Sequence, residues 1–216
     1  MNVESASPKL AHAPTAVEKY YQAHARIYDA TRWSFLFGRA GILEEMAAIA
    51  APTRILEVGC GTGRNLVSLC RRFPEADVTG LDMSEAMLER ARGKSACIGG
   101  RLRLLHRAYD TPLDERSGFD YILFSYALSM FNPGFERAIV TAERDLADGG
   151  HIAVVDFHDT RLPLFERWMG VNHVRMNGQL RPLLRERFEP RVDRLHKAYG
   201  GVWRYLMFVG RKRAKV

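Results

Sequence analysis

Residues 57–63 constrain the possible folds of this chain more than any other segment. They read Glu-Val-Gly-Cys-Gly-Thr-Gly and lie between a short strand pattern at 54–58 and a helical pattern at 64–73. Glycine adopts turn conformations that other residues avoid, and it lets a ligand approach the backbone closely. A strand, a glycine turn and a helix in this order indicate an α/β fold. A bound ligand and a simple tight turn both explain the glycines at this point.

The alternation of strands and helices continues along the chain. Strands separated by helices predict a parallel, doubly wound α/β sheet. We expect further strands at 77–81, 102–106, 121–124 and 151–157, helices at 84–92 and 136–146, a glycine turn at 148–150 that ends the second of these helices, and two edge strands at 192–197 and 203–209.

The composition limits the class of protein and of partner. With 47% hydrophobic and 26% charged residues, the chain is typical of globular proteins. No apolar run reaches the roughly 18 residues of a membrane span, and residues 1–14 lack the apolar core of a signal peptide, so we expect a cytoplasmic protein. The net charge of +7 favours an anionic partner, either nucleic acid or a membrane face.

The residue types that bind metal ions are scattered along the chain. Cys60, Cys70 and Cys97 lack the spacing of a zinc site or a disulfide framework, so we expect reduced thiols. The histidines are isolated as well: His24, His158 and His173. We therefore expect no metal site and read these histidines as structural or surface residues.

The glycine spacing and two carboxylates indicate what the turn binds. The spacing is GxGxG and not the GxGxxG of dinucleotide sites, and Glu57 is an unfavourable neighbour for a pyrophosphate but a good one for a ligand with a sulfonium and an ammonium group. Asp82 ends the second strand 19 residues after Gly63, where a carboxylate can accept both ribose hydroxyls. The ligand is predicted to be a cationic nucleoside.

These residues resemble the class I methyltransferases, whose motif is E/DxGxGxG followed by an acidic residue at the end of the second strand. The resemblance spans residues 15–212 and implies S-adenosylmethionine as cofactor. It implies that Gly59, Gly61 and Gly63 form the cofactor turn beside Glu57, with Gly59 and Gly61 near the methionine part. It also implies that Asp82 holds the ribose.

The adenine side of the site departs from the family pattern. The family usually carries an acidic residue after the third strand, but aligning Pro112 with its proline places Arg107 there. The resemblance then implies that Met83 packs on the adenine and that Ala108 and Tyr109 contact it through backbone and ring.

The resemblance also organises the chain into one domain with distinct parts. We expect a loose tail at 1–14 and a single methyltransferase domain at 15–216. Its parts are a helical lid at 15–50 that is interrupted near Gly38, a cofactor-binding core at 51–157, a basic and partly helical insertion at 158–191, and the edge strands within 192–216.

The acceptor of the methyl group is indicated by the segment after the fourth strand. Methyltransferases that act on nucleic-acid amines carry Asn/Asp-Pro-Pro-Tyr there to hold a flipped base. Here residues 125–131 read Ser-Tyr-Ala-Leu-Ser-Met-Phe. This difference argues against nucleic acid as partner, and the basic charge then favours an anionic membrane surface.

Residues 28–39 and 125–130 resemble the betaine-lipid N-methyltransferases, which methylate the amine of diacylglyceryl homoserine three times. The resemblance implies that Tyr28 closes over the cofactor, that Ser125 and Tyr126 line the methyl-transfer pocket, and that all three are catalytic residues. It also implies cofactor contacts from Arg39 and Ser125. Because related phospholipid N-methyltransferases share a Tyr-Asp near the start, phosphatidylethanolamine stays open as the substrate.

A lipid substrate requires contacts with the membrane and with the headgroup. Trp33, Phe35, Leu36 and Phe37, between Arg32 and Arg39, are predicted to form an interfacial helix, although the same side chains suit the core face of the lid. An aromatic cage for the methylated nitrogen is expected from Tyr21, Tyr28, Tyr126 or Tyr199, and a guanidinium for the carboxylate from Arg32, Arg175 or Arg204.

Overall fold

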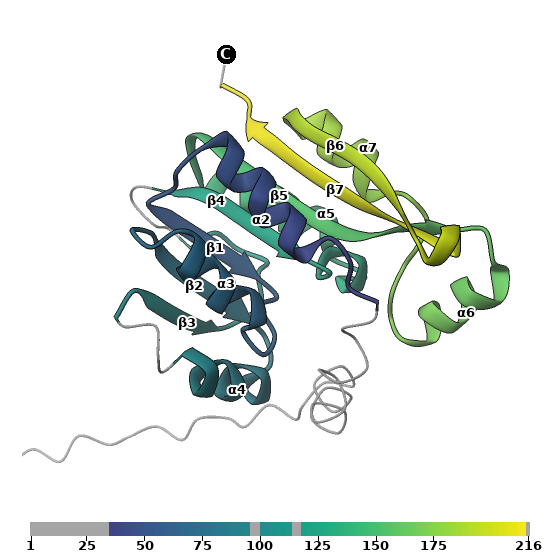
Figure 1. Cartoon of the computed structure of the whole chain (residues 1–216), viewed down its shortest axis with the longest axis horizontal. Helices are drawn as coiled ribbons and strands as arrows, with labels where there is room; N and C mark the ends of the chain where they lie inside the picture. The colour runs from purple at the N-terminus through teal and green to yellow at the C-terminus, as the bar shows by residue number, and fades with distance from the viewer. Residues whose placement is uncertain (1–34, 96–99, 114–117, 215–216) are drawn as a thin grey trace, which may run out of the picture.

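The computed structural model describes residues 35–95, 100–113 and 118–214, and these form one sheet covered by helices (Figure 1). The strand order in this part of the chain is β3-β2-β1-β4-β5-β7-β6. The predicted doubly wound α/β fold is confirmed. The strands are β1 (Arg54–Val58), β2 (Asp77–Asp82), β3 (Leu102–His106), β4 (Phe119–Ser125), β5 (Leu146–Thr160), β6 (Phe188–Ala198) and β7 (Trp203–Lys212).

The sheet changes from parallel to antiparallel at its last two strands. Strands β1 to β5 pair in parallel, whereas β7 pairs antiparallel with both β5 and β6. Strands β6 and β7 form a hairpin across the short helix η2 (Tyr199–Gly201). Both predicted C-terminal strands are therefore confirmed, but only β6 lies at the sheet edge, because β7 lies between β5 and β6. Strand β6 begins four residues before the predicted 192, directly after a helix ends.

Helices cover both faces of the sheet. Helices α2 (Arg39–Ile49) and α3 (Arg64–Arg72) lie in front of it in Figure 1, and α5 (Phe135–Asp145) and α7 (Leu180–Arg187) lie behind it. Helix α4 (Glu85–Ser95) packs beside α3 and β3. Helix α2 is the described part of the predicted lid, because residues 1–34 lie outside the described residues.

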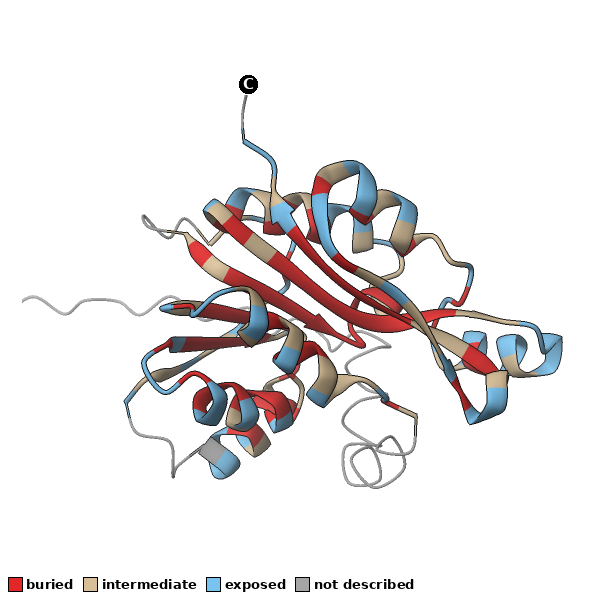
Figure 2. Cartoon of the chain, turned by 45° about the horizontal axis from the view of Figure 1, so that its top comes forward, coloured by how far each residue is buried: buried red, intermediate tan, exposed pale blue. Residues whose placement is uncertain are grey.

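The strands are buried on both faces, as a covered parallel sheet requires. In β4, Tyr121 and Leu123 contribute to the core under α2 and α3, whereas Ile122 and Phe124 contribute to the core under α5 and α7. All four side chains are fully buried. Figure 2 shows the same pattern along the central strands.

The glycine turn predicted at 148–150 lies inside a strand instead. Helix α5 ends at Asp145 and β5 begins at once with Leu146, so that Gly149, with a φ of 77°, falls where the pairing of β4 with β5 shifts register. The expected glycine turn after the helix is wrong because the glycines form an irregularity in β5.

The predicted basic insertion contains two helices with different surroundings. Helix α7 buries Leu180 and Leu184 in the core behind the sheet. Helix α6 (Pro163–Val171) follows the end of β5 and projects from the right-hand end of the molecule in Figure 1. Within the described residues, no helix is long and apolar enough to cross a membrane.

The central strand should dominate stability. We expect Leu123→Ala, in the fully buried strand β4, to lower the free energy of unfolding by about 2–5 kcal/mol, because it leaves a cavity. Leu164→Ala on α6 is the matched control: its side chain is 84% exposed, so a change within about 0.5 kcal/mol is expected. Urea unfolding of both variants measures the difference, and equal effects would contradict this picture of the core.

Candidate functional site

The candidate site lies where the strand order reverses. The chain runs from β1 outward to β2 and β3 on one side and to β4 and β5 on the other, so the segments that follow β1 and β4 separate at the carboxyl ends of these strands. Val58 pairs with Phe124 in the sheet. The glycine turn after β1 and Ser125 at the end of β4 therefore lie side by side.

The three glycines of the turn serve different purposes. All have positive φ, and a Cβ on Gly59 would lie 2.8 Å from the Cβ of Ala127. A Cβ on Gly63 would lie 2.9 Å from the Cβ of Ala91, so Gly63 lets α4 approach the turn closely. Around Gly61 no described residue other than its chain neighbours comes within 4 Å of the added Cβ. Gly61 thus borders open space in which a ligand fits.

Backbone hydrogen bonds hold the turn against the end of β2. The amides of Gly59 and Cys60 both donate to the carbonyl of Leu81, at 2.8 and 3.0 Å. The carboxylate of Asp82 accepts from the amide of Gly61 at 2.7 Å and from the amide of Ser84 at 2.9 Å. Burial raises the pKa of Asp82 above its usual value, although these amides oppose the shift. Asp82 shapes the turn, and its contact with the ribose stays a prediction.

Glu57 is a buried carboxylate with one hydrogen-bonded oxygen. The side-chain amide of Asn65 in α3 donates to its Oε1 at 2.8 Å, whereas Oε2 is buried without a hydrogen-bond partner among the described residues. Burial raises the pKa of Glu57 to about 8, and the nearby positive charge of Arg39 opposes part of this shift. A buried oxygen without a partner is costly, and a cationic group at this position would satisfy it.

These features fit the cofactor implied by the sequence. The open oxygen of Glu57 suits an ammonium, the space beside Gly61 admits a ligand close to the backbone, and Met83 is exposed beside Asp82, where an adenine can pack. Ser125 adds a second buried oxygen, Oγ, without a hydrogen-bond partner. Ala108 is exposed at the start of the loop after β3.

The ring of Tyr109, which we expected to contact adenine, belongs to the core instead. The ring is buried against Phe124, and its hydroxyl donates to Asp145 at the end of α5 at 2.8 Å. Asp145 also accepts from the amide of Leu113. Tyr109 therefore fixes the loop after β3, and only its backbone remains a candidate for contact with adenine. Arg107 bonds within the same loop, to Ala108 and Thr111.

Tyr126 joins the loop after β4 to the start of α2. Its hydroxyl donates to the carbonyl of Phe37 at 2.7 Å, and its ring packs on Phe157 with a centroid distance of 4.7 Å. The guanidinium of Arg39 lies 6.0 Å from the ring centre. The backbone of Tyr126 has a strained φ of 57°. Burial raises the pKa of Tyr126 well above its usual value, so the phenol stays neutral. These contacts suit a positioning residue.

The predicted membrane helix is only partly available to a membrane. Leu36 is buried in the core under α2, so its predicted membrane contact is wrong. Phe35 is half-buried and stacks on Trp203 at 5.5 Å. Phe37 is exposed at the rim, edge-on to the ring of Tyr199 at 5.3 Å. These residues act mainly as the core face that the sequence left open as the alternative.

The predicted headgroup residues lie in different surroundings. Arg204 is held by the carboxylate of Asp159 through two nitrogens, so its predicted role as a carboxylate receptor is wrong for this arrangement. Arg175 is exposed, and its backbone amide donates to the carbonyl of Ser129 at 3.0 Å. Tyr199 is exposed next to Phe37. The remaining predicted residues lie outside the described residues: Tyr21, Tyr28, Arg32 and Trp33.

Sequence reasoning missed two residues that organise the site. Asn65 holds Glu57, and Asp156 in β5 accepts from the amide of Ser129 at 3.1 Å, which fixes the loop after β4. Burial raises the pKa of Asp156 to about 6. A carboxylate inside the apolar strand predicted at 151–157 was a signal in the sequence, because buried acids need donors.

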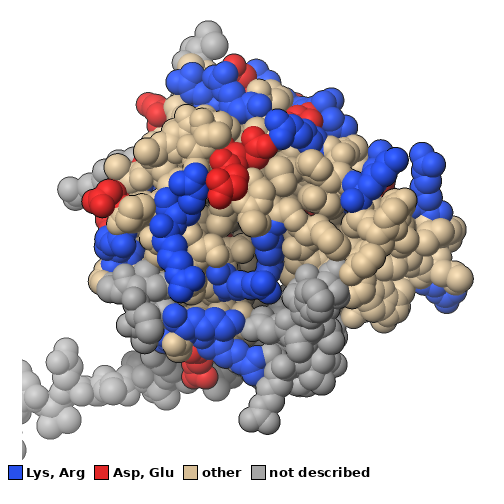
Figure 3. Space-filling view, viewed as in Figure 1, with Lys and Arg blue, Asp and Glu red and all other residues tan. Residues whose placement is uncertain are grey.

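A cavity of about 580 Å³ opens between α2 and α3, next to the Glu57 and Asn65 pair. Figure 3 shows Lys and Arg side chains in the middle of the corresponding face. The lining includes Gly38, Arg39, Glu44, Asn65, Arg64, Arg71 and Arg72. Cys60 and Cys70 are buried free thiols, and the described residues hold no cluster that could bind a metal ion.

Comparison with known proteins agrees with this site. Residues 55–150 match the family described as a methyltransferase domain. Over 131 residues the chain is 30% identical to a demethylmenaquinone methyltransferase of Staphylococcus aureus, covering 60% of this chain and 53% of that protein. The chain spans between 30% and 53% of the length of the curated relatives that it matches.

Solved structures show the same fold at low identity. The N-methyltransferase NodS of Bradyrhizobium japonicum, in complex with S-adenosylhomocysteine, has a TM-score of 0.68 at 18% identity and covers 82% of this chain and 86% of its own. The [4+2]-cyclase SpnF has a TM-score of 0.77 at 16% identity and covers 94% and 98%. The chain therefore has the class I methyltransferase fold, which also supports another reaction.

Cofactor binding should depend on pH through Glu57. A cation beside a carboxyl group favours its ionised form, so binding of S-adenosylhomocysteine should release a proton while the pH is below the pKa of about 8. We expect Kd to fall as pH rises from 6 to 8, by up to about tenfold per unit. Calorimetry should show this trend in the wild type and not in Glu57→Gln. A flat wild-type profile would rule out Glu57 as the ammonium partner.

Asp82→Ala should weaken binding of S-adenosylhomocysteine by about 1–3 kcal/mol, because ribose hydroxyls and the Gly61 amide lose a charged acceptor. Asp120→Ala is the control. Asp120 accepts from the amides of Thr53 and Arg54 at the opposite end of the sheet, so its loss should reduce stability without changing cofactor affinity. Unchanged affinity in Asp82→Ala would mean that the ribose is held elsewhere.

Proposed function

We propose that this chain is an S-adenosylmethionine-dependent N-methyltransferase that acts at a membrane surface on the amine of diacylglyceryl homoserine. The observation that carries the methyl transfer is the buried oxygen of Glu57 beside the open space at Gly61, within residues that match a methyltransferase domain. The likeness to N-methyltransferases of known structure supports nitrogen as the acceptor. The resemblance of residues 28–39 and 125–130 supports the betaine-lipid substrate.

The chemistry places modest demands on the protein. The cofactor supplies an activated methyl group on a sulfonium, and the protein has to bring a neutral amine into line and exclude water. Ser125 provides a buried acceptor at the end of β4 for an N–H of the amine. Asp156 and Tyr126 hold the surrounding loop in place. None of these roles requires a metal ion or a covalent intermediate.

The headgroup would be held beside this pocket. The loop of Ser129 is bonded to the backbone of Arg175, whose exposed guanidinium is available for the homoserine carboxylate. A nitrogen that has gained methyl groups keeps no donor, so retention between rounds relies on aromatic rings. Tyr199 is the exposed ring of the described residues nearest to the lid segment that ends at Phe37. The basic net charge of +7 suits the inner, anionic face of a membrane.

Other functions remain distinct hypotheses. Phosphatidylethanolamine is the closest alternative substrate, and another small-molecule amine fits the same chemistry. An oxidoreductase that uses a nicotinamide cofactor is disfavoured by Glu57 and the GxGxG spacing. A lipid-binding module without turnover shares the charge but has no need for the buried oxygens of Glu57 and Ser125.

Liposomes that contain diacylglyceryl homoserine distinguish these hypotheses. With S-adenosylmethionine, the protein should give mono-, di- and trimethylated products by mass spectrometry. Parallel liposomes with phosphatidylethanolamine should give little product. If only phosphatidylethanolamine gave product, it would become the substrate in place of diacylglyceryl homoserine. Absence of product from both lipids would refute lipid N-methylation.

Ser125→Ala tests the role assigned to the end of β4. Because its Oγ is buried without a partner in the protein, its removal should leave the free energy of unfolding unchanged or slightly higher. Methyl transfer should fall by about tenfold if Oγ accepts a hydrogen bond from the amine, which corresponds to about 1.4 kcal/mol. Full activity in Ser125→Ala would remove this residue from the mechanism.

A further inference from the structure

Helix α6 exposes an apolar surface that the other described elements leave uncovered. The side chains of Leu164 and Val171 are 84% and 74% exposed, and that of Trp168 is 51% exposed. Residues 164, 168 and 171 recur at intervals of four and three, so they form one stripe along the helix. Leu162, which precedes the helix, is exposed beside them. We call these four residues the α6 stripe.

A second stripe of the same helix already anchors it to the domain. Phe165 stacks on Trp203 of β7 at 5.2 Å, and Met169 is buried in the core under α2. Trp168 of the α6 stripe is only half-exposed, because its ring lies 6.0 Å from the ring of Phe35. The outward stripe is therefore not required to hold the helix in place.

The charges around the α6 stripe complement an anionic surface. Arg161, Arg167 and Arg175 are exposed on or next to the helix, and Glu166 is the single acidic residue between positions 161 and 175. A helix with an apolar stripe, a half-exposed tryptophan and flanking arginines has the pattern of an interfacial membrane helix. Basic residues near an anionic bilayer are attracted to its surface.

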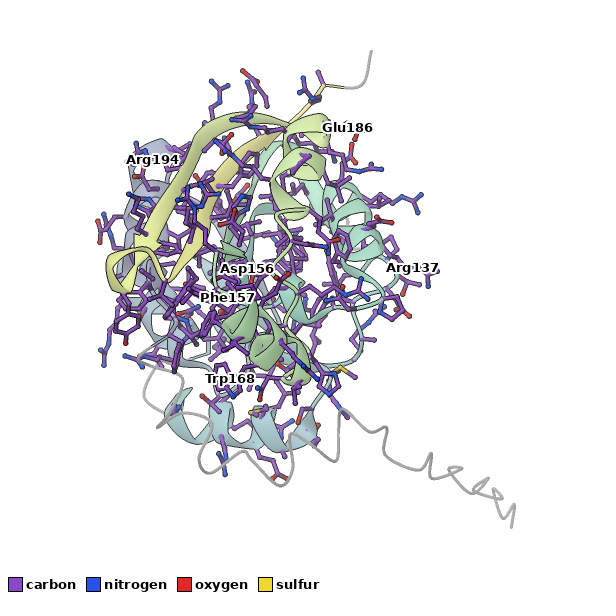
Figure 4. All side chains as sticks on the ribbon, turned by 90° about the vertical axis from the view of Figure 1, so that its right-hand side faces the viewer. Arg137, Asp156, Phe157, Trp168, Glu186 and Arg194 are labelled. Carbon is purple, nitrogen blue, oxygen red and sulfur yellow. The ribbon has the colours of Figure 1, made fainter. Side chains whose placement is uncertain are left out.

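The α6 stripe lies at the same edge of the sheet as the candidate site. Two hydrogen bonds connect α6 to the loop after β4. Asp156, in the strand before α6, accepts from the amide of Ser129 in that loop. After α6, the amide of Arg175 donates to the carbonyl of Ser129. Figure 4 views this edge directly, with Trp168 below Asp156 and Phe157. A membrane or other surface that binds α6 therefore lies next to the candidate site.

We propose that the α6 stripe is the membrane-docking surface of this protein and that it binds the face of an anionic lipid bilayer. The proposal rests on the proposed function for its membrane location and identifies the contact that the lid residues were expected to make. Leu164, Val171 and Leu162 enter the acyl boundary, Trp168 lies at the headgroup level, and the arginines contact anionic headgroups.

Vesicle binding without turnover tests the proposal. Vesicles of phosphatidylcholine with phosphatidylglycerol, containing neither candidate substrate, are sedimented with the full-length protein. The double variant Leu164→Glu/Val171→Glu should bind at least about tenfold more weakly, since two apolar side chains leave the interface. Because both side chains are highly exposed, its unfolding and its binding of S-adenosylhomocysteine should be unchanged.

Arg137→Glu is the matched control. It lowers the net charge by two, as the double variant does, and lies on α5 at the right-hand edge of the view in Figure 4, away from Trp168 near the middle. It should bind vesicles within about twofold of the wild type, because only charges within a Debye length of the bilayer contribute fully. Equal loss of binding in both variants would show a general charge effect and overturn the proposal.

Tryptophan fluorescence identifies the side chain that enters the bilayer. The chain has three tryptophans, of which Trp203 is buried. Vesicles should shift the emission to shorter wavelength in the wild type and in Trp33→Phe, and the shift should be lost in Trp168→Phe. If the emission shift were lost in Trp33→Phe instead, the docking surface would be the lid and not α6.

The outcomes separate this proposal from the proposed function. Vesicle binding that requires the α6 stripe, together with no methylated lipid, keeps the docking surface and rejects the substrate. Methylated lipid together with wild-type vesicle binding by Leu164→Glu/Val171→Glu keeps the function and rejects the docking surface. A wild-type dimer that this double variant converts to monomers, with vesicle binding unchanged, would assign the stripe to a protein interface.

Discussion

The buried carboxylate of Glu57 is the constraint around which the rest of this structure is arranged. Glu57 lies near the end of β1, where it loses its hydration, and among the described residues only Asn65 returns a hydrogen bond to it. The packed sheet tolerates this because β1 and the strands on both sides of it bury large apolar side chains, such as Leu56, Leu81 and Leu123. The Oε2 atom of Glu57, which lacks a partner among the described residues, is available to bind a ligand and makes the turn selective for a cation.

The surrounding elements hold the glycine turn and the loop after β4 in place. Asp82 holds the amide of Gly61, so the turn keeps its shape while one side faces open space. Asp156 does the same for the loop after β4. Both sides of the site are thus braced by carboxylates that accept from backbone amides, which fixes the geometry without occupying the space between them.

Local patterns predicted the fold and the cofactor side of the site, and long-range packing decided the rest. The glycine turn, Glu57 and Asp82 are contiguous with regular strands, so sequence spacing places them correctly. The partner of Tyr109 is Asp145, 36 residues away, and the partner of Arg204 is Asp159, 45 residues away. No local periodicity encodes such pairs. Leu36 was misassigned for the same reason, because only the fold shows which apolar faces are covered.

The hydrogen bonds that Asp145 accepts from Tyr109 and Leu113 limit how this fold can be varied. The loop after β3 and the end of α5 belong to opposite halves of the sheet, yet one buried carboxylate joins them. A buried carboxylate without donors is unfavourable by several kcal/mol. A loop grafted from a relative at 107–113 will therefore keep its shape here only if it brings its own donors to Asp145, so the two halves have to change together.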